Sequence, residues 1–432
     1  AFLSRGLVGV LSGQLRCWTN LQQALFLQHQ LAAQRLQAGD AEAALRTLAA
    51  FEQNLVQHGA ELTPEMSLTM RLLKGLAHLR LGEQENCLSN FTTASCLLPI
   101  EGEGVHRLQR GSRAAMREFT ALLESSPEDL RARWLLNIAA MTVGEYPAGV
   151  PARWRMDPQS FASEHPLPRF PDVAGELGLD VHDLAGGVIA EDFDNDGDLD
   201  LMLSAWGLDG QLRYFVNNGD GTFTQRTAEA GLIGLVSGLN LVQTAYNNGG
   251  FMDVLVLRGA WLGAAGRHPN SPLRNNGDRT FDDVTEEAGL LSFRPTQTAV
   301  WFDFDGDGWL DLFIGNEGWE TERHPCELFR NNGDGTFTEM AAAAGLAVNE
   351  FIKGVATGDF NNDGRPDLYL SNRSGPNRLF RNDGPGPGGR WRFTDVTAQA
   401  GVAEPRHSFP TWFFDYDNDG HEDLLVTGYA IR

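Results

Sequence analysis

Apolar residues recur at intervals of three and four through residues 19–145, which is the period of amphipathic helices. The first run carries Leu21, Leu25, Leu31 and Leu36, and the second carries Ala44, Leu45, Leu48 and Phe51. Gly39 and Asp40 separate the two runs. The pattern therefore predicts a pair of helices joined at this turn.

A second helical pair is expected to begin at Pro64. Its apolar positions run from Leu72 to Leu81, and the spacing predicts a turn at Gly82 and a second helix that continues to Leu98. Small residues such as Gly82 allow helices to approach closely where they cross.

A third pair is expected over residues 111–125 and 127–143, where Pro127 suits the first turn of a helix and a preceding serine suits its cap. Three such pairs predict a tetratricopeptide-like helical repeat domain over residues 1–145. A plain helical bundle has the same periodicity and remains the alternative.

Residues 146–169 contain five prolines and show neither helical nor strand periodicity, which predicts a connecting strap. Trp154 and Phe161 are large apolar residues within it. We therefore expect the strap to pack against a neighbouring surface.

From residue 170 to residue 432, short β-type runs alternate with Gly, Asn and Asp, and three phrases repeat. A phrase resembling F-x-D-V-T-x-x-A-G-L begins at Phe170, Phe223, Phe281, Phe337 and Phe393. The phrase N-N-G-D-G-T, or a variant, begins at Asn217, Asn275, Asn331 and Asn382. The phrase D-x-D-x-D-G-x-x-D ends at Asp200, Asp311, Asp367 and Asp423, and a decayed copy ends at Asp253.

The final aspartates of the third phrase are 53, 58, 56 and 56 residues apart, so one period governs the whole region. Each period holds about four short strands, with Asn-Gly and Asp-Gly turns between them, as in a propeller blade. The predicted fold is a helical repeat domain followed by an all-β propeller over residues 170–432. About five blades are visible, as part of a seven-bladed or similar ring.

Each intact acidic loop places oxygen-bearing side chains at positions 1, 3, 5 and 9 and a glycine at position 6. The glycine permits a sharp turn that folds these side chains around one centre. Hard oxygen donors suit Ca²⁺, which takes about 6–8 oxygen ligands, better than Mg²⁺, which demands strict octahedral geometry. The predicted side-chain ligands are Asp192, Asp194, Asp196, Asp200, Asp303, Asp305, Asp307, Asp311, Asp359, Asn361, Asp363, Asp367, Asp415, Asp417, Asp419 and Asp423. The backbone carbonyl at position 7 would add Asp198, Trp309, Arg365 and His421.

An EF-hand begins similarly, but it needs a carboxylate at position 12 and a helix on either side. Position 12 is occupied here by Leu203, Ile314, Leu370 and Val426, and the flanking residues are strand-like. The decayed loop has Ala245, Asn247 and Gly249 at positions 1, 3 and 5. We therefore expect four structural Ca²⁺ ions and none in the decayed loop.

These repeats resemble the FG-GAP or VCBS type of calcium-binding β-propeller repeat. The order of helices, Pro-rich strap and blades, with phrases such as 133–137 and 191–193, is similar to bacterial proteins of the cartilage acidic protein-like, ASPIC/UnbV group. The resemblance implies an exported protein in which Ca²⁺ loops stabilise the blades. It is closer over 170–432 than over 20–169.

Charge divides along the same boundary. Residues 1–169 hold 16 basic and 16 acidic residues, whereas residues 170–432 hold 18 basic and 41 acidic residues, and the net charge is -23. Sixteen aspartates lie in the four intact loops, so four Ca²⁺ would change the net charge to about -15. A field of this sign repels phosphate and disfavours nucleic-acid or anionic lipid partners. No apolar run approaches the length of about 18 residues that a transmembrane helix needs.

Two further patterns accompany the repeats. Aromatic residues follow the final aspartates at corresponding positions and predict either an aromatic rim for a glycan or protein, or packing between blades. Arg-His-Pro occurs twice at matching positions, as inherited repeat geometry or as a functional histidine pair. The residues concerned are Trp206, Trp261, Trp319 and Tyr429, and His268 and His324. Cys326 lies near His324 without a third orienting group and does not indicate a nucleophile.

We expect a non-enzymatic scaffold in the periplasm, at the cell surface or outside the cell, which binds a protein partner or a glycan, alone or as an accessory subunit. The alternative is a polysaccharide-binding lectin or a polysaccharide lyase. A lyase needs a base beside calcium, and the only lysines are Lys74 and Lys353. Because an open arc exposes sheet edges, we expect residues beyond Arg432 or another chain to close the ring.

Overall fold

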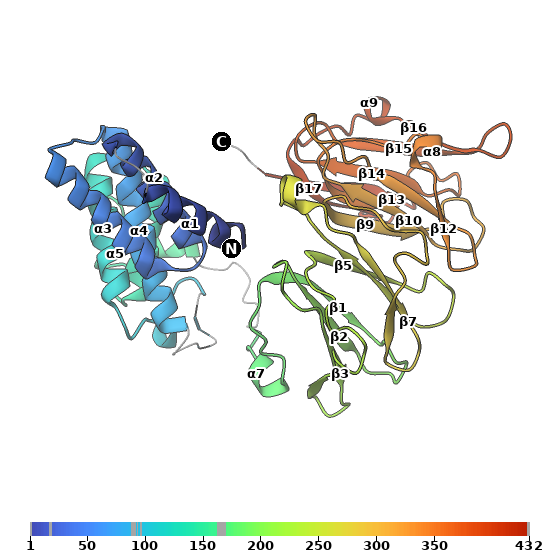
Figure 1. The fold of residues 1–432 in the computed structure, drawn as a ribbon, viewed down its shortest axis with the longest axis horizontal. Coiled ribbons are helices and arrows are strands. Elements are labelled where there is room, and N and C mark those ends of the chain that lie inside the picture. The colour runs from blue at the N-terminus through green and yellow to red at the C-terminus, as the bar shows by residue number, and fades with distance from the viewer. Residues whose placement is uncertain are drawn as a thin grey trace. The chain divides into compact units, whose positions relative to one another are not determined.

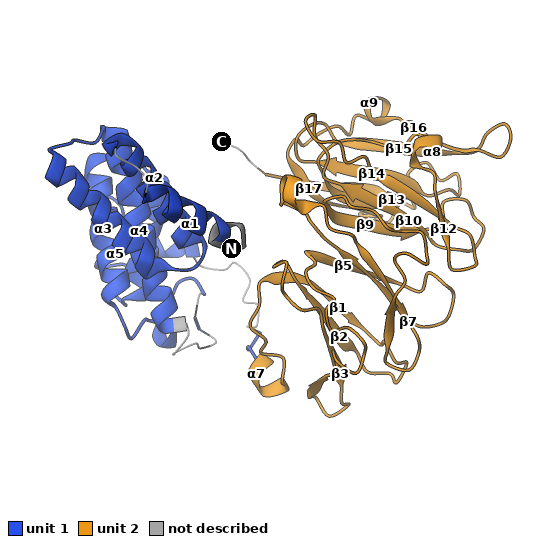
Figure 2. Ribbon diagram, in the orientation of Figure 1, with its two compact units in different colours: residues 1–173 blue, residues 174–432 orange. Residues whose placement is uncertain are grey.

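The computed structural model describes residues 2–16, 20–87, 92, 94–95, 97–161 and 170–429. The chain divides into two compact units, residues 1–173 and 174–432 (Figures 1 and 2). Residues 162–169 of the expected strap lie outside the described residues, as do Cys17 and Cys96.

The first unit is helical, and each helix contacts the next one in sequence (Figure 1). The helices are α1 (Phe2–Leu15), α2 (Leu21–Gln37), α3 (Ala41–His58), α4 (Pro64–Cys87), α5 (Arg110–Ser125) and α6 (Leu130–Thr142), with 3-10 turns η1 (Gly102–Gly104) and η2 (Pro158–Phe161). Within the described ranges, no helix combines the length and the apolar character needed to cross a bilayer.

The predicted turn at Gly82 is wrong, because α4 continues through it as one helix. Gly82 instead lies where α4 crosses α5. A Cβ atom placed on Gly111 would lie 2.5 Å from the backbone nitrogen of Gly82 and 2.6 Å from the carbonyl oxygen of His78. The glycine thus serves the close approach of two helices and does not end one.

The predicted helix start at Pro127 is also wrong. Helix α6 begins at Leu130, and the Asp129 carboxylate accepts hydrogen bonds from the backbone N–H groups of Arg131 and Ala132. An aspartate in this place accepts hydrogen bonds from two N–H groups that have no partner inside the helix. Its negative charge also interacts favourably with the positive end of the helix dipole. This cap sets the boundary.

The described part of the strap packs on the helical unit. Trp154 is buried in a cluster that includes Phe119 and Leu136. The Nδ2 atom of Asn137 donates to the carbonyl oxygen of Trp154 at 2.9 Å, and the Arg133 Nε atom donates to the same oxygen at 3.2 Å. Polar side chains of α6 therefore fix the strap backbone over the helices.

The second unit contains repeated antiparallel sheets. Within the residues that the structure describes, four sheets have four strands each, in the orders β1-β2-β3-β4, β5-β6-β7-β8, β9-β10-β11-β12 and β13-β14-β15-β16, and a fifth contains β17 and β18. The strands are β1 (Ala185–Glu191), β2 (Asp200–Ala205), β3 (Arg213–Asn217), β4 (Phe223–Gln225), β5 (Asn240–Thr244), β6 (Asp253–Leu257), β7 (Ser271–Asn275), β8 (Phe281–Asp283), β9 (Thr296–Phe302), β10 (Asp311–Asn316), β11 (Glu327–Asn331), β12 (Phe337–Glu339), β13 (Ile352–Gly358), β14 (Asp367–Asn372), β15 (Arg378–Pro385), β16 (Trp391–Asp395), β17 (Ser408–Phe414) and β18 (Asp423–Gly428). The short helix α7 (Ala174–Leu177) precedes β1. The short helices α8 (Ala341–Ala344) and α9 (Thr397–Ala400) and the turn η3 (Gly263–Gly266) lie between strands. The predicted order, helices followed by repeated β-sheets, is confirmed.

The first strand of each sheet contacts the first strand of the next, from β1 through β5, β9 and β13 to β17 (Figure 1). Apolar side chains fill the spaces between neighbouring sheets. One cluster joins Met202 of the first sheet to Val256 of the second, and another joins Phe313 of the third to Leu370 of the fourth. Burial between sheets accounts for the strands that are apolar on both faces.

The repeated phrases tie each sheet to the next through the backbone. The backbone N–H of Phe281 donates to the carbonyl oxygen of Ala230, and that of Phe337 donates to the carbonyl oxygen of Ala288. A glycine with positive φ follows each of these alanines, and at Gly289 a Cβ atom would lie 3.4 Å from the Phe337 carbonyl oxygen. The A-G-L and Phe positions therefore repeat because they form the junction between sheets.

Candidate metal centre

The four intact acidic loops all lie at the same end of the strands in their sheets. Each loop joins the first strand of a sheet to the second, and its position 9 is the first residue of that second strand. The loops comprise residues 192–200, 303–311, 359–367 and 415–423. The repeat thus presents a corresponding turn in five successive sheets, which is acidic in four of them and decayed at 245–253.

The carboxylate at position 1 stabilises each turn through hydrogen bonds. In the first loop, Asp192 accepts hydrogen bonds from the backbone N–H of Asp196 at 3.0 Å and of Gly197 at 2.9 Å. The same two bonds form in the other intact loops around Asp303, Asp359 and Asp415. These bonds bring the first five positions of each loop around one point.

Carboxylate oxygens gather in three of the four loops. Sets of three lie with their oxygen atoms within 4.8 Å of one another: Asp192, Asp194 and Asp196, then Asp303, Asp305 and Asp311, and then Asp415, Asp417 and Asp423. In the remaining loop, position 3 is an amide, and the Asn361 Nδ2 atom donates to Asp363 at 3.0 Å. Each of these three sets therefore joins three of the four predicted side-chain ligands of its loop, and among the described residues the loop 359–367 has no such set of three carboxylates.

Position 9 serves the sheet as well as the loop. Asp200, Asp311 and Asp367 are fully buried, whereas Asp423 is exposed. The Asp311 carboxylate accepts from the backbone N–H of Asn331 at 2.8 Å and of Phe304 at 3.1 Å. Burial raises the pKa of Asp311 to about 7, because desolvation disfavours the ionised carboxylate.

Position 4 is a feature that the sequence analysis missed. Its residue has a positive φ angle in every loop, and this residue is Asn195, Gly306, Asn362 or Asn418 in the intact loops and Asn248 in the decayed one. The Asn195 side chain donates to the carbonyl oxygen of Gly250 at 3.1 Å, and the Asn248 side chain donates to that of Gly308 at 3.2 Å. Neighbouring loops are therefore bonded to one another. The signal in the sequence was the recurrence of Asn or Gly at position 4.

Position 7 was predicted to supply a carbonyl oxygen. The backbone N–H at this position donates to the carboxylate at position 5 in all four loops, from Asp198, Trp309, Arg365 and His421. The carbonyl at this position remains a predicted ligand.

Arginine side chains contact the loop carboxylates, which the sequence analysis did not foresee. The Arg279 Nε atom lies 2.5 Å from Asp194, and the Arg330 Nε atom lies 2.5 Å from Asp305. The side chain of Arg365 contacts Asp363 at 2.6 Å. Positive charge at these sites lowers the repulsion between carboxylates and would compete with a cation.

The donor set fits a hard divalent cation. Within the part of the chain that the structure describes, the buried Oδ1 atom of Asp305 and Oδ2 atom of Asp367 have no hydrogen-bond partner. Buried polar atoms normally have a partner, and an ion coordinated by oxygen would supply one. The ligands are carboxylates and one amide, which are the donors that Ca²⁺ takes.

The decayed loop keeps its backbone without its charges. Asn248 and Gly250 have positive φ angles, like positions 4 and 6 of the intact loops. Asp253 is buried and accepts from the backbone N–H of Asn275 at 2.8 Å. Burial raises the pKa of Asp253 to about 7. This aspartate joins two strands in a loop that has no other carboxylate.

The aromatic and histidine patterns lie away from the loops. The Trp206 Nε1 atom donates to Ala260 of the next sheet, and the Trp319 ring lies 5.4 Å from that of Phe351. His324 is buried, with its Nε2 atom 3.4 Å from Glu322. Among the contacts of the described residues, none joins His324 to His268.

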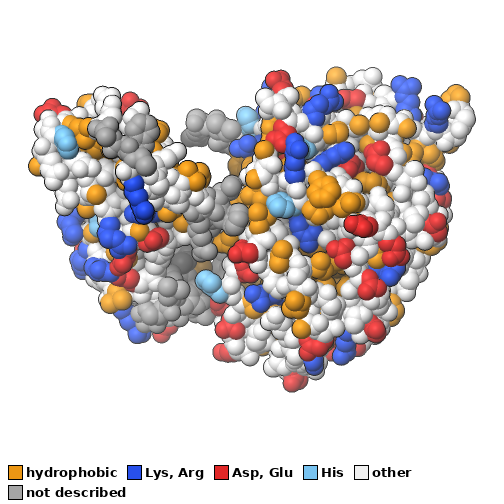
Figure 3. All heavy atoms as spheres, in the orientation of Figure 1, with side chains coloured by type: hydrophobic (Ala, Val, Ile, Leu, Met, Phe, Trp, Pro, Cys, Tyr) orange, Lys and Arg blue, Asp and Glu red, His pale blue; other side chains and the backbone are white. Residues whose placement is uncertain are grey.

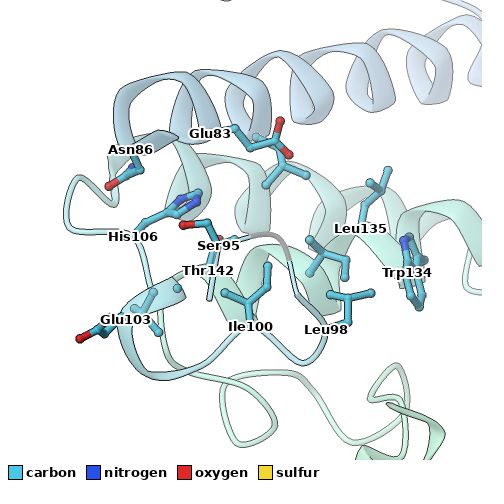
Figure 4. Close-up of a pocket in the computed structure, with 14 residues that line it drawn as sticks. Glu83, Asn86, Ser95, Leu98, Ile100, Glu103, His106, Trp134, Leu135 and Thr142 are labelled. Atoms are coloured by element: carbon cyan, nitrogen blue, oxygen red, sulfur yellow. The ribbon is translucent and has the colours of Figure 1, made fainter. Parts of the chain in front are cut away.

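A separate cavity of about 300 Å³ lies in the helical unit (Figure 4). Its walls are mostly apolar, including Leu98, Ile100 and Leu135, and His106 and Glu83 add polar groups. Burial lowers the pKa of His106.

The FG-GAP-like repeat family matches this chain at residues 192–256, 246–314, 303–370 and 359–426. Each match runs from one acidic loop to the strand that follows the next loop.

Among known proteins, the chain is 31% identical to cartilage acidic protein 1 of Homo sapiens over 170 residues, which cover 38% of this chain and 24% of that protein. It is 35% identical to cartilage acidic protein 1 of Xenopus tropicalis over 123 residues, which cover 28% and 18%. The matched part thus spans about a quarter or less of these relatives.

A solved structure, "Crystal structure of BBS1N in complex with ARL6DN, soaked with lead", is 7% identical and covers 57% of this chain and 90% of its own, with a TM-score of 0.21. A TM-score this low establishes no common arrangement. The repeat matches, in contrast, span more than half of the sequence, and the chain belongs to the FG-GAP-like repeat family.

Proposed function

We propose that this protein is a calcium-stabilised interaction scaffold that works outside the cytoplasm. The observation that carries the proposal is the row of four acidic loops, which share one set of backbone hydrogen bonds at one edge of successive sheets. FG-GAP-like repeats are typical of interaction scaffolds, and relatives named for cartilage support a location outside the cell.

Calcium has a structural role in this proposal. Each ion is held by the side chains at positions 1, 3, 5 and 9 and by the carbonyl at position 7, and it offsets the repulsion among them. An ion that binds only the folded state raises the free energy of unfolding by mass action.

The sheets form part of a closed propeller ring, in which the acidic loops occupy one end.

The test is thermal unfolding with and without calcium. The protein is freed of metal, and its melting temperature is measured in EDTA and in millimolar Ca²⁺, with Mg²⁺ as the control ion. We expect a rise of several degrees with Ca²⁺ and a smaller one with Mg²⁺. If a sample shown to bind Ca²⁺ melts at the same temperature in EDTA, the ions do not stabilise the fold.

Saccharide binding is a second candidate function, as a property of the scaffold and without catalysis. It is favoured by a partly exposed aromatic cluster around Trp261, at the opposite edge of the sheets from the acidic loops. Lys353, one of the two lysines, is buried in an ion pair there and does not face solvent as a base would. This geometry supports binding over lyase chemistry.

A further inference from the structure

Five aromatic rings form a continuous cluster where the first strands β13 and β17 begin and the second strands β6, β10 and β18 end. The sequence of contacts runs from Trp319 through Phe351, Trp261 and Phe409 to Tyr429, with ring centroids 5.4, 5.9, 6.3 and 6.0 Å apart. The first four rings are partly buried and Tyr429 is exposed. In Figure 3, hydrophobic side chains interspersed with Lys and Arg gather on the face of the β unit near β17.

This cluster lies at the end of the strands opposite the acidic loops. Strand β13 begins at Ile352, next to Phe351, and ends at Gly358, next to the loop that starts at Asp359. Ile352 pairs with Asn372 at one end of the sheet, and Gly358 pairs with Asp367 at the other. The aromatic cluster is therefore independent of the proposed ion sites.

A buried ion pair holds the central ring. The Lys353 Nζ atom lies 3.3 Å from the centroid of the Trp261 ring and pairs with the Glu317 carboxylate, and both side chains are fully buried. The second oxygen of Glu317 accepts the backbone N–H of Trp261 at 2.8 Å. The two charged residues thus fix both the ring and the backbone of this tryptophan.

Trp261 also has a strained backbone, with a φ angle of +65°. This conformation is uncommon for residues other than glycine, and it is unfavourable for a bulky side chain. Such strain persists where the surroundings impose it and is frequent at binding sites. The ion pair beneath Trp261 supplies that constraint.

Among the described residues, Arg373 is a cation that contacts the cluster rings and has no ion-pair partner. Its guanidinium carbon lies 5.1 Å from the Trp261 centroid and 5.6 Å from the Phe351 centroid, and the residue is exposed. Its backbone is fixed, since its N–H donates to the Phe351 carbonyl and its own carbonyl lies 2.7 Å from the His407 Nδ1 atom. Within the described residues, no hydrogen bond or ion pair occupies the guanidinium.

We propose that this aromatic cluster binds an acidic saccharide, with the rings against the C–H faces of the sugar and Arg373 on its carboxylate. Aromatic faces attract weakly positive C–H groups, because the ring carries negative charge above its plane. A planar guanidinium forms two parallel hydrogen bonds with a carboxylate. The protein as a whole repels anions at a charge of -23, so recognition of an acid requires a cation with no partner, and Arg373 provides it.

This inference deepens the saccharide-binding candidate and does not depend on calcium. The test is titration of the whole protein with tetragalacturonate, followed by tryptophan fluorescence and calorimetry. The comparison ligands are maltotetraose, which lacks carboxylates, and a tetra-aspartate peptide, which lacks sugar rings. We expect binding of the acidic saccharide at least tenfold tighter than of either comparison ligand.

Variants identify the site. Arg373→Gln should weaken binding of tetragalacturonate at least tenfold, and Phe409→Ser should weaken it severalfold. Matched controls are Arg226→Gln, an exposed arginine that pairs with Glu229, and Trp412→Ala, an exposed tryptophan elsewhere on β17. Both controls should bind like the unaltered protein.

Other results overturn the proposal. Absence of saturable binding, equal affinity for maltotetraose, equal affinity for tetra-aspartate, or unchanged affinity in Arg373→Gln would each do so. Thermal melts of all variants show whether a loss arises from unfolding. Repeating the titration in EDTA separates this site from the acidic loops, because the affinity of the folded protein should not change.

Discussion

The Nδ2 atom of Asn331 donates a hydrogen bond of 2.9 Å to the backbone carbonyl of Tyr246, a residue of the preceding sheet. The same amide group bonds to Leu310 in its own sheet at 3.1 Å. Asn275 and Asn382 make the corresponding contacts to Phe193 and Phe304. The first asparagine of the N-N-G-D-G-T phrase is therefore the side chain that joins one sheet to the next.

The first prediction concerns this asparagine. Asn331→Ala should lower the free energy of unfolding by about 1–3 kcal/mol, because it leaves buried carbonyl groups without a donor. Asn332→Ala is the matched control, because Asn332 is exposed and its side chain bonds only within the same hairpin. Urea denaturation measures both. Equal effects of the two changes would show that the contact between sheets contributes little.

The second prediction concerns the number of ions. Calorimetric titration of the metal-free protein with Ca²⁺ should give about four sites, and Asp303→Asn should remove or weaken one of them. Asp253→Asn should leave the number unchanged, because the decayed loop has lost its other carboxylates. A fifth site that disappears in Asp253→Asn would contradict the assignment.

The third prediction concerns pH. Asp253 has a pKa of about 7 in the folded protein, above its ordinary value of 3.8. The folded state therefore binds more protons, and this residue's contribution to stability is full at low pH and is lost as pH rises through about 7. Asp253→Asn, which cannot ionise, should gain stability relative to the unaltered protein between pH 5 and pH 8. Urea denaturation at both pH values measures this, and a constant difference would exclude ionisation of Asp253 as its cause.

The fourth prediction concerns the helical crossing. Gly111→Ala should destabilise the protein by about 1–3 kcal/mol, because the added methyl group meets the backbone of α4. Gly9→Ala is the control, since open space surrounds this glycine in α1 and alanine favours helix by about 1 kcal/mol. Thermal melts should move in opposite directions. A neutral Gly111→Ala would mean that α4 and α5 separate easily.

The fifth prediction concerns the buried ion pair. Lys353→Met should cost about 3–5 kcal/mol, because it leaves the Glu317 carboxylate buried without a partner. Lys353→Met combined with Glu317→Leu should recover much of that loss, since an apolar pair needs no desolvation of charge. Denaturant unfolding of both variants measures the coupling. Additive losses would argue against a direct interaction.

The repeats could be predicted from the sequence because three phrases agreed on one period. The acidic loops were located correctly, since a fixed spacing of Asp and Gly determines a local turn. Helix boundaries were predicted less accurately from the sequence. Glycine is typical of turns, so the sequence predicts a turn at Gly82. Its role in the close approach of two helices depends on Gly111, which lies far away in sequence. Asp129 was overlooked beside Pro127, although it caps α6.

Contacts between distant residues could not be predicted. Arg279 and Arg330, which contact loop carboxylates, come from other turns or strands, and no local pattern marks them. The partners of Trp261 are similarly remote, because Glu317 and Lys353 belong to two other sheets. Periodicity gives the position of a residue within a repeat, whereas such contacts depend on how the repeats are packed together.

The arginines that contact the acidic loops also bear on the order of events in folding. Arg279 and Arg330 supply positive charge to carboxylates that would otherwise repel one another while the chain collapses. These two loops can then take their native shape without metal, and an ion bound as proposed above would displace the guanidinium group. Assembly of the sheets would thus be separate from ion supply, and metal would consolidate a fold that already exists.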